Sequence, residues 1–491
     1  MRLRSLPVWL VPSTVTLLVT LVGLDSAQPW RDELATWSAA TRGLTGLFRL
    51  TGTIDAASAP YYLLMHAWST VAGDSVAALR LPSALAMATT AGLTALLGQR
   101  LWDVRVGTLA GLLFAVLPGT SRYGQEARPY AVASALAVLS TLLLVDALRR
   151  PARRRWVGYA AATTAVGLTH LVALTLLAAQ ALAVLTRTGG VRAATGPDDG
   201  DRAGGSGRRR VSPVWSWLVA LVPVALAVVP VALVARGQRA RQLDWVDAAR
   251  PGDLAALATG VAQSGVVGGV LLGLAALGAA RAGRRGLLPL SCVLAPVLLL
   301  FLAGLVVPLW VPRYLVFVVP FGCLLAGTAL ASTRLPAALA VVVLTGLLGL
   351  PDQAALRRTH EWPRSATVDY RAVAEIVASG RRPGDAVVYS PRDSWFFLDL
   401  GLRYHLGDRT PRDALLVEEA QRRGDLWAAE CDRPAECLAG ADRVWLVRAG
   451  RRADPLAGVP GAKGDALRDG FTVAEVWPRP GITLALLTRR G

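Results

Sequence analysis

The chain has 491 residues, of which 53% are hydrophobic and 18% are charged, and its mean hydropathy is +0.44. A soluble protein of this length carries closer to a quarter charged residues, so the composition excludes an ordinary soluble enzyme and indicates a membrane-embedded body. The net charge of +18 would suggest nucleic-acid binding in a soluble chain. Here the arginines gather in short loops between apolar runs, as the positive-inside rule requires, so no nucleic-acid partner is expected.

Apolar runs long enough to cross a bilayer, roughly 20 residues each, recur along the chain. The run 156–186 is too long for one span and carries Gly167 and His170 near its middle, so we divide it at His170. The first run resembles a signal peptide but is longer than the usual apolar core of one, so we expect an uncleaved first helix. We predict eleven spans, at 6–24, 79–99, 106–120, 129–148, 156–186 (two), 214–235, 255–280, 287–308, 314–331 and 336–351.

The placement of arginines predicts the orientation of these spans in the plasma membrane. With the N-terminus in the cytoplasm, the basic loops 149–155, 187–213 and 281–286 all fall on the cytoplasmic side. The segments 25–78, 121–130 and everything after 351 then lie outside the cell. The loop 187–213 is rich in Gly, Arg and Asp and is expected to be a disordered cytoplasmic linker.

We expect two domains, a transmembrane domain at 1–351 and a small extracytoplasmic α/β domain at 352–491. Within the first, the outer loop 25–78 contains an amphipathic stretch and an apolar stretch too short to cross, and we interpret both as interfacial helices. In the second, DYRAVAEIVASG predicts a helix, and DAVVYSP, DRVWLVR, TVAEVW and ITLALLT predict strands. Cys431 and Cys437 lie six residues apart in a polar stretch, which favours a local disulfide outside the cell.

The predicted outer side carries acidic, basic and phenolic side chains together, which is the inventory for moving a proton and holding an anion. They include the adjacent carboxylates of PWRDELATW and several residues of SRYGQEARPY. From spacing alone a structural role stays open for several: Asp32 as a helix cap, Arg128 as a snorkelling anchor, His170 as a core hydrogen bonder and Arg313 as a rim residue. The candidate residues are Asp32, Glu33, Tyr61, Tyr62, Tyr123, Gln125, Glu126, Arg128, Tyr130, His170, Asp244, Trp245, Arg313 and Tyr314.

The ordered motifs RDE, SAPYYLLMHAW, LRLPSALAM, SRYGQEARPYA, THL and PRYLVFVVP resemble bacterial members of the GT-C glycosyltransferase superfamily. The similar proteins are protein O-mannosyltransferases, aminoarabinose transferases and actinobacterial mannosyltransferase-like membrane proteins. The resemblance covers about residues 1–351 and weakens beyond them. It implies transfer of a sugar, mannose or arabinose-like, from a polyprenyl-phosphate donor to an acceptor hydroxyl on the outer face of the membrane. The implied acceptor is a protein, a lipoglycan or a wall polysaccharide.

The resemblance also implies roles for particular residues. Asp32 corresponds to the family's first-loop catalytic acid and would act as the general base of an inverting transfer, with Glu33 beside it. Arg128 and Arg313 would hold the donor phosphate. His170, Tyr61 and Tyr123 would contact the donor sugar or phosphate, and Gln125 and Glu126 would orient sugar or acceptor hydroxyls.

The chain departs from some relatives in two places. Ser58-Ala59-Pro60 stands where some carry His-Pro-Pro, and Gln125-Glu126 stands where some have an Asp. A divalent metal, Mg or Mn, is therefore an open expectation that the sequence does not require, with Asp32 and Glu126 as its candidate ligands. Two other functions also stay open: a flippase for a lipid-linked sugar, and a non-catalytic scaffold of the cell envelope. A flippase would be expected to carry charges near the middle of its spans and a repeat between its halves, and the sequence shows neither.

Overall fold

The computed structural model describes residues 6–186, 212–360 and 367–491, which form two compact units. The first, here called the helical unit, comprises Met1–Leu24 and Arg80–Ala355, and the second, called the mixed unit, comprises Asp25–Leu79 and Leu356–Gly491. The segment after the first predicted span therefore groups with the C-terminal part of the chain. The predicted linker 187–213 lies, except for its last two residues, outside the described residues.

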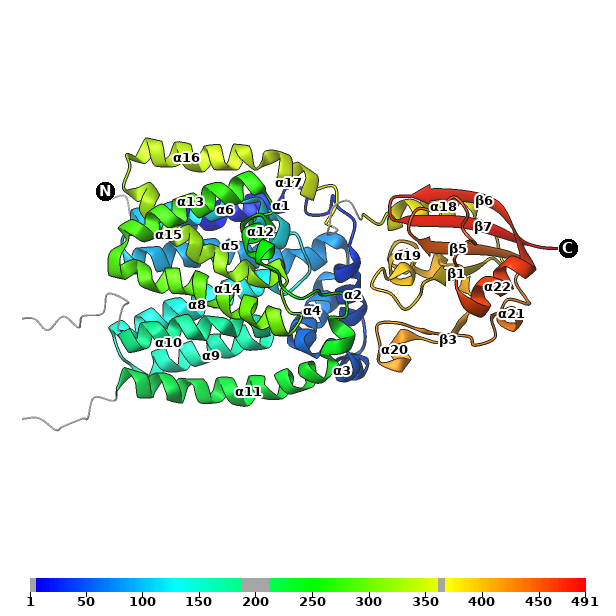
Figure 1. The fold of residues 1–491 in the computed structure, drawn as a ribbon, viewed down its shortest axis with the longest axis horizontal. Coiled ribbons are helices and arrows are strands. Elements are labelled where there is room, and N and C mark those ends of the chain that lie inside the picture. Colours follow the sequence, from blue (N-terminus) through cyan, green and yellow to red (C-terminus); the bar gives the residue numbers. More distant parts are fainter. Residues whose placement is uncertain (1–5, 187–211, 361–366) are drawn as a thin grey trace, which may run out of the picture. The chain divides into compact units, whose positions relative to one another are not determined.

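The helical unit is built from apolar helices, most of which run side by side (Figure 1). They are α1 (Leu10–Leu21), α5 (Val76–Leu101), α6 (Val104–Val116), α7 (Pro118–Gly124), α8 (Tyr130–Arg149), α9 (Arg153–Thr169), α10 (Leu176–Thr186), α11 (Pro213–Gln242), α12 (Pro251–Ala262), α13 (Gly265–Arg281), α14 (Leu287–Val306), α15 (Val319–Ala331), α16 (Leu335–Leu348) and α17 (Leu350–Leu356). Three 3-10 segments join them: η2 (Leu171–Thr175), η3 (Gly283–Gly286) and η4 (Pro312–Val318). The predicted α-helical membrane fold is confirmed.

The structure does not confirm the predicted number of spans. Among the described residues, five helical segments are long and apolar enough to cross a membrane, and the number rises to eight if each of three bent helix pairs forms one span. The helices Leu10–Leu21 and Leu171–Thr186 are apolar but shorter. The predicted total of eleven spans is therefore not confirmed.

Breaks in the helices occur where the backbone has a local reason to turn. The predicted division at His170 is confirmed, because α9 ends at Thr169 and His170 is extended, with φ −156° and ψ 100°. The predicted spans 106–120 and 255–280 each contain a bend, since α6 and α7 meet at 68° and α12 and α13 at 102°. Pro118 begins α7, where its missing N–H is harmless, and the Ser264 hydroxyl caps α13 by accepting the Val267 N–H.

Small residues let the helices of this unit approach each other closely. A side chain at Gly278 of α13 would lie 1.8 Å from the Leu325 carbonyl oxygen of α15, and one at Gly107 of α6 would lie 2.2 Å from that of Ala95 in α5. Close backbone approach through small residues replaces the hydrophobic driving force that lipid removes. A larger residue at either position would force the helices apart.

The mixed unit combines four short helical segments from the first loop with a small α/β region. The former are α2 (Arg31–Ala40), α3 (Leu44–Thr53), η1 (Ala56–Ser58) and α4 (Ala59–Ala72). The α/β region contains α18 (Tyr370–Gly380), β1 (Ala386–Ser390), α19 (Leu398–Leu406), η6 (Gly407–Arg409), β2 (Arg412–Asp413), β3 (Leu416–Glu418), α20 (Ala420–Arg423), β4 (Ala429–Glu430), α21 (Pro434–Cys437), β5 (Arg443–Ala449), α22 (Gly461–Gly470), β6 (Phe471–Arg479) and β7 (Ile482–Arg489).

The strands of the α/β region form a five-stranded sheet in the order β2-β1-β5-β7-β6 and a separate antiparallel pair, β3-β4. In the larger sheet β1 is parallel to β2 and β5, whereas β7 is antiparallel to both β5 and β6. Alternate residues of β5, among them Val444 and Leu446, pack into an apolar core with Leu467 of α22. The predicted helix and strands of this region are confirmed, and Cys431 and Cys437 form the disulfide that their spacing suggested.

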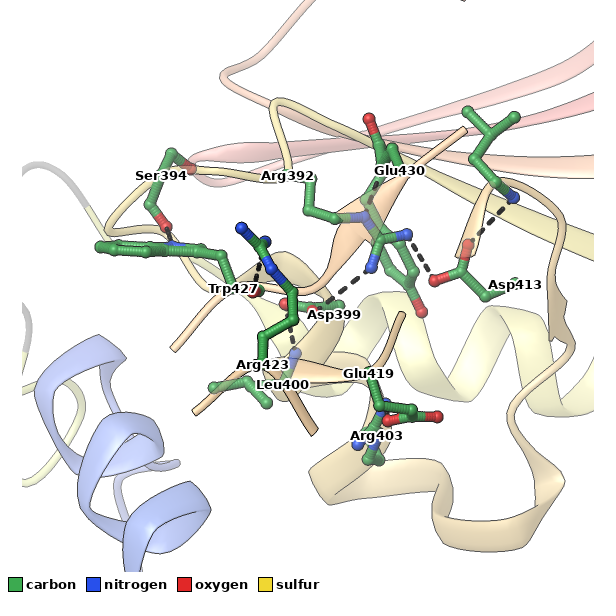
Figure 2. A network of polar contacts seen from close by, with 12 residues as sticks. Arg392, Ser394, Asp399, Leu400, Arg403, Asp413, Glu419, Arg423, Trp427 and Glu430 are labelled. Carbon is green, nitrogen blue, oxygen red and sulfur yellow. Dashed lines mark hydrogen bonds and ion pairs between the residues drawn. The ribbon is translucent and has the colours of Figure 1, made fainter. Parts of the chain in front are cut away.

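A buried guanidinium joins the ends of several elements in this region (Figure 2). Arg392, only 4% exposed, follows β1. Its Nε donates to Glu430 Oε1 at 3.0 Å, its Nη1 lies 3.5 Å from Asp399 Oδ2, and its Nη2 contacts Asp413. The pKa values of Asp399 and Asp413 are both raised, because burial disfavours the charged form. The positive charge of Arg392 opposes this shift without cancelling it. The positive charge thus lets β2, β4 and α19 place carboxylates in the interior.

The stability of the mixed unit is expected to fall in mild acid because of His405. Burial, with Arg371 nearby, lowers its pKa from 6.5 to about 4. The unfolded chain therefore takes up a proton between these pH values while the folded chain does not, so His405 stabilises the fold above pH 6.5 and this contribution is lost as the pH falls towards 4.

Thermal unfolding of the full-length protein in lipid, followed by fluorescence between pH 7 and 4.5, checks this expectation. The variant His405→Gln should lose less stability over that range than the wild type, and His66→Gln serves as a histidine control. Parallel curves for His405→Gln and the wild type would contradict the assignment.

Candidate active site

The predicted site residues divide between the two units. Asp32, Glu33 and Tyr61 belong to the mixed unit, and the others belong to the helical unit: Tyr123, Gln125, Glu126, Arg128, His170 and Arg313.

The acidic pair lies in the first turn of α2. Glu33 is buried, and its Oε2 accepts the Trp30 N–H at 3.3 Å, so the capping role suggested for Asp32 falls to Glu33. Glu33 Oε2 also lies 3.9 Å from Nδ1 of the buried His360. Asp32 is half-buried in the same turn, where the positive end of the helix dipole favours its negative charge.

Ser58-Ala59-Pro60, which stands where some relatives carry His-Pro-Pro, belongs to a local network of hydrogen bonds around Asp55. Asp55, with φ 65°, accepts hydrogen bonds from the Ser58 hydroxyl at 3.0 Å and from the Tyr62 hydroxyl. Tyr61 and Tyr62 are both buried at the start of α4. Ser58 therefore helps to shape the turn before α4, and Tyr61 lies inside the unit.

Helix α2 is held against the C-terminal part of the mixed unit by long-range hydrogen bonds. Buried Arg42, just past the end of α2, donates to Ser38 O at 3.1 Å, to Ser38 Oγ at 3.2 Å and to Asp425 O at 2.6 Å. Gln28, before α2, donates to Val368 O at 2.7 Å. Burial lowers the pKa of Arg42 to about 10, so it stays charged at neutral pH. Both flanks of the helix that carries Asp32 are thus anchored.

In the helical unit, aromatic and basic side chains meet at the end where α8 begins and α9 ends. The His170 ring centre lies 5.8 Å from that of Tyr130 and 5.4 Å from that of Tyr314. Tyr123 packs edge-on against Tyr130 at 5.8 Å. Because helix starts and ends alternate along the chain, residues from α7, α8, η4 and the break after α9 converge here. We call this group the aromatic cluster.

Arg313 joins the aromatic cluster from η4. Its Nε donates to the Tyr130 hydroxyl at 3.1 Å, and its guanidinium lies 5.0 Å from the ring centre of the exposed Trp245. Arg313 is itself half-buried. Contact on two sides orients its planar guanidinium, a group whose shape suits recognition of a phosphate.

The remaining predicted residues of the outer segment are engaged by the protein itself. Gln125 Nε2 donates to Thr20 O and Val22 O, both at 2.8 Å, and so fixes the end of α1. Glu126 is buried in an ion pair with Arg122 at 2.8 Å. Arg128 is half-buried two residues further on. Of these residues, Arg128 has the more exposed position for contact with a ligand.

Several residues that shape the two groups carried no signal in the sequence. Arg122 was indistinguishable from a surface arginine, yet it neutralises Glu126. Gln263, with φ 58°, lies 3.5 Å from the Tyr123 hydroxyl and lay inside an apolar run. His360 and Arg42 act through partners more than 300 residues away. The one exception is the pair Gln263-Ser264, because two polar residues within an apolar run indicate a break in the helix.

No group of three or more His, Cys, Asp or Glu side chains suited to a metal ion is present in the part of the chain that the structure describes. Nδ1 of His170 is buried and has no hydrogen-bond partner among those residues. A buried imidazole nitrogen without a partner is available to a ligand that enters the aromatic cluster.

Comparisons with known proteins found a family model that matches part of the chain and solved structures with a similar fold. Residues 55–194 match the family model described as dolichyl-phosphate-mannose-protein mannosyltransferase. Among solved structures, ArnT from Cupriavidus metallidurans bound to undecaprenyl phosphate matches with a TM-score of 0.63 and 15% identity over 96% of both chains. Its apo structure matches with a TM-score of 0.63 and 13% identity, again over 96% of both chains. An Archaeoglobus fulgidus oligosaccharyltransferase in complex with zinc and sulfate matches with a TM-score of 0.50 and 14% identity, over 97% of this chain and 72% of that one.

The chain therefore shares the fold of ArnT, and the predicted resemblance to the GT-C superfamily is confirmed. The particular likeness to ArnT covers nearly the whole chain, so it extends past residue 351, where the sequence motifs end. A comparison with curated protein sequences gave no match.

Replacing Arg42 should loosen α2 without unfolding the protein. The variant Arg42→Met leaves the Ser38 hydroxyl and the Asp425 carbonyl without their donor, a loss of about 1–3 kcal/mol. Hydrogen exchange of the α2 amides in the full-length protein should rise at least about fivefold in this variant. Arg403→Met, at an exposed ion pair with Glu419, is the control and should leave α2 unchanged. Equal protection of α2 in all three proteins would contradict the anchoring role.

Proposed function

We propose that this protein is a glycosyltransferase that moves a sugar from a polyprenyl-phosphate donor to an acceptor hydroxyl at the outer face of the membrane. The family-model match and the fold shared with ArnT support the class of reaction. The arginine-poor side of the helices, which the charge pattern places outside the cell, carries the candidate residues. A lipid-linked donor suits an enzyme whose site lies at the membrane surface.

The observation that carries this proposal is the orientation of Arg313 in the aromatic cluster. The Tyr130 hydroxyl and the Trp245 ring hold its guanidinium, and His170 adds a buried nitrogen nearby. A planar cation held in place, beside aromatic rings at a helix boundary, is what a prenyl phosphate with a sugar attached requires. Arg128 is the second candidate cation for the same phosphate.

The proposed reaction needs one base and one stabilised leaving group. The acceptor oxygen forms a bond to the anomeric carbon while the bond from that carbon to the phosphate oxygen breaks, and the phosphate keeps the electron pair. Asp32 takes the proton of the acceptor hydroxyl, so the sugar is transferred with inversion through an oxocarbenium-like state. Arg313 and Arg128 balance the charge that grows on the departing phosphate.

Asp32 is a better candidate for the base than Glu33. Glu33 is buried and already accepts the Trp30 N–H, so its carboxylate serves the start of the helix. Asp32 is half-buried and therefore more accessible to an acceptor. The donor sugar is proposed to be mannose or an arabinose-like sugar, and the acceptor a protein, a lipoglycan or a wall polysaccharide.

Replacing Asp32 tests the catalytic step. The variant Asp32→Asn keeps the size of the side chain but not its basicity, so turnover should fall by about 10²–10⁴-fold while donor binding is kept. Release of polyprenyl phosphate from radiolabelled polyprenyl-phosphate-mannose or -arabinose, with protein in lipid, measures it. Asp74→Asn, also in the first loop, is the control. Equal turnover of Asp32→Asn and wild type would remove Asp32 from catalysis, and no turnover by the wild type with any lipid donor would favour a flippase or a scaffold.

Replacing Arg313 tests the phosphate site. Arg313→Lys keeps the charge but loses the fork and the hydrogen bond to Tyr130, so binding of undecaprenyl phosphate should weaken about 10–100-fold. Tyr130→Phe should have a smaller effect in the same direction, because only the orientation of Arg313 is loosened. Arg100→Lys, at an exposed ion pair with Asp146, is the matched control. Unchanged affinity in Arg313→Lys would place the phosphate elsewhere.

A further inference from the structure

The mixed unit contains a concave site that shares no residue with α2 or with the aromatic cluster. It is a groove of about 500 Å³ between the C-terminal end of α18 and strands β5, β7 and β6 of the five-stranded sheet. Residues of β5, β6 and β7 line it, on the face of β5 opposite to the core side chains Val444 and Leu446. The volume is in the range of sites that bind small molecules.

Two stacked indoles form the aromatic part of the groove. The rings of Trp445 and Trp477 lie 5.7 Å apart at an interplanar angle of 26°. Trp445 is 1% exposed, and its Nε1 donates to Asp385 Oδ2 at 2.8 Å, so its ring is fixed. Gly380 lets α18 end against this ring, because a Cβ there would lie 3.0 Å from Trp445 Cη2. Trp477, half-buried on β6, therefore stacks on the Trp445 ring, whose orientation is fixed.

Polar groups surround these rings on both sides. Arg443 Nε lies 3.4 Å from Asp385 Oδ1 and its Nη2 donates to Gly380 O at 3.2 Å, whereas its Nη1 has no partner among the described residues. Glu475 lies on β6 and Thr488 on β7 of the same sheet. The lining thus offers donors and acceptors around an aromatic surface, with the Arg443 charge already balanced by Asp385.

This combination fits a neutral sugar better than other ligands. A hexose ring has an apolar C–H face that can stack on an indole and a rim of hydroxyls that both donate and accept hydrogen bonds. An anion would meet Glu475 and an arginine that is already paired. An apolar peptide side chain would leave the polar lining without partners.

We propose that this groove binds a neutral hexose oligosaccharide, with Trp477 as the stacking residue and Arg443 and Glu475 as hydrogen-bonding residues. Its role as a holding site for a saccharide acceptor rests on the proposed transferase function. The binding itself does not, because the groove and the aromatic cluster share no residue. A growing glycan held here would stay with the enzyme between transfers.

Binding of mannohexaose to the full-length protein in lipid nanodiscs, without donor, tests the proposal by calorimetry. The wild type should bind, and Trp477→Ala should weaken binding about tenfold, the upper range of one aromatic stacking contact. Trp477→Phe keeps a ring and should lose less, and Glu475→Gln should lose affinity without any change of volume. Val473→Ala, on the same strand but outside the groove lining, is the matched control and should bind as the wild type does.

Two further measurements separate this proposal from the proposed function. Undecaprenyl phosphate should bind equally to Trp477→Ala and wild type, and mannohexaose should bind equally to Asp32→Asn and wild type. Failure of the transferase assay together with mannohexaose binding that depends on Trp477 would leave the groove as a saccharide site. Absence of mannohexaose binding in the wild type, or equal binding by Trp477→Ala, Glu475→Gln and wild type, would overturn the proposal.

Discussion

The buried guanidinium of Arg42 is the contact that joins α2 to the C-terminal part of the mixed unit. A charge withdrawn from water is tolerated only where acceptors replace the solvent, and Ser38 and Asp425 supply three. One of these acceptors lies 383 residues away in the sequence, so the contact makes the first loop and the C-terminal region one body. Gln28 anchors the N-terminal flank of α2 in the same way, so α2 holds Asp32 in a fixed position. A proposed base needs such positioning, since a small displacement from its acceptor lowers the rate steeply.

Hydropathy predicted most of the fold because each apolar run must become a helix in lipid, where no other local structure satisfies the backbone. The same argument explains the failures. The run 255–280 contains Gln263-Ser264 but no charge, and hydropathy averaged over a window cannot detect the sharp turn that those two residues make. The break at His170 was predictable because the run around it exceeded the length of one span. In the α/β region, alternation and turn residues indicated every long strand, whereas the two-residue strands β2 and β4 depend on the tertiary contacts of Arg392.

The candidate site was predictable as an inventory and not as an arrangement. The charge pattern predicted which side chains share one side of the membrane, which stays a prediction. In the structure, helix boundaries bring Tyr130, His170 and Arg313 together as residues at the ends of neighbouring elements. The different roles of Asp32 and Glu33 could not be predicted, because adjacent carboxylates are equivalent in a sequence. The structure distinguishes them, since Glu33 accepts the Trp30 N–H. Arg122 and Gln125 show the opposite case, since polar residues of an apparent active-site segment instead hold the helices in place.

The composition of the mixed unit has a consequence for how the chain is made. Residues 25–79 leave the ribosome early, and their partners after residue 356 follow only when more than 270 further residues have been synthesised. At about 5–20 residues per second this delay is on the order of tens of seconds. During that time α2 lacks the acceptor at Asp425 and the contact of Trp37 with Tyr404. The helical unit can assemble first, and the last part of the chain then completes a body that the first part began.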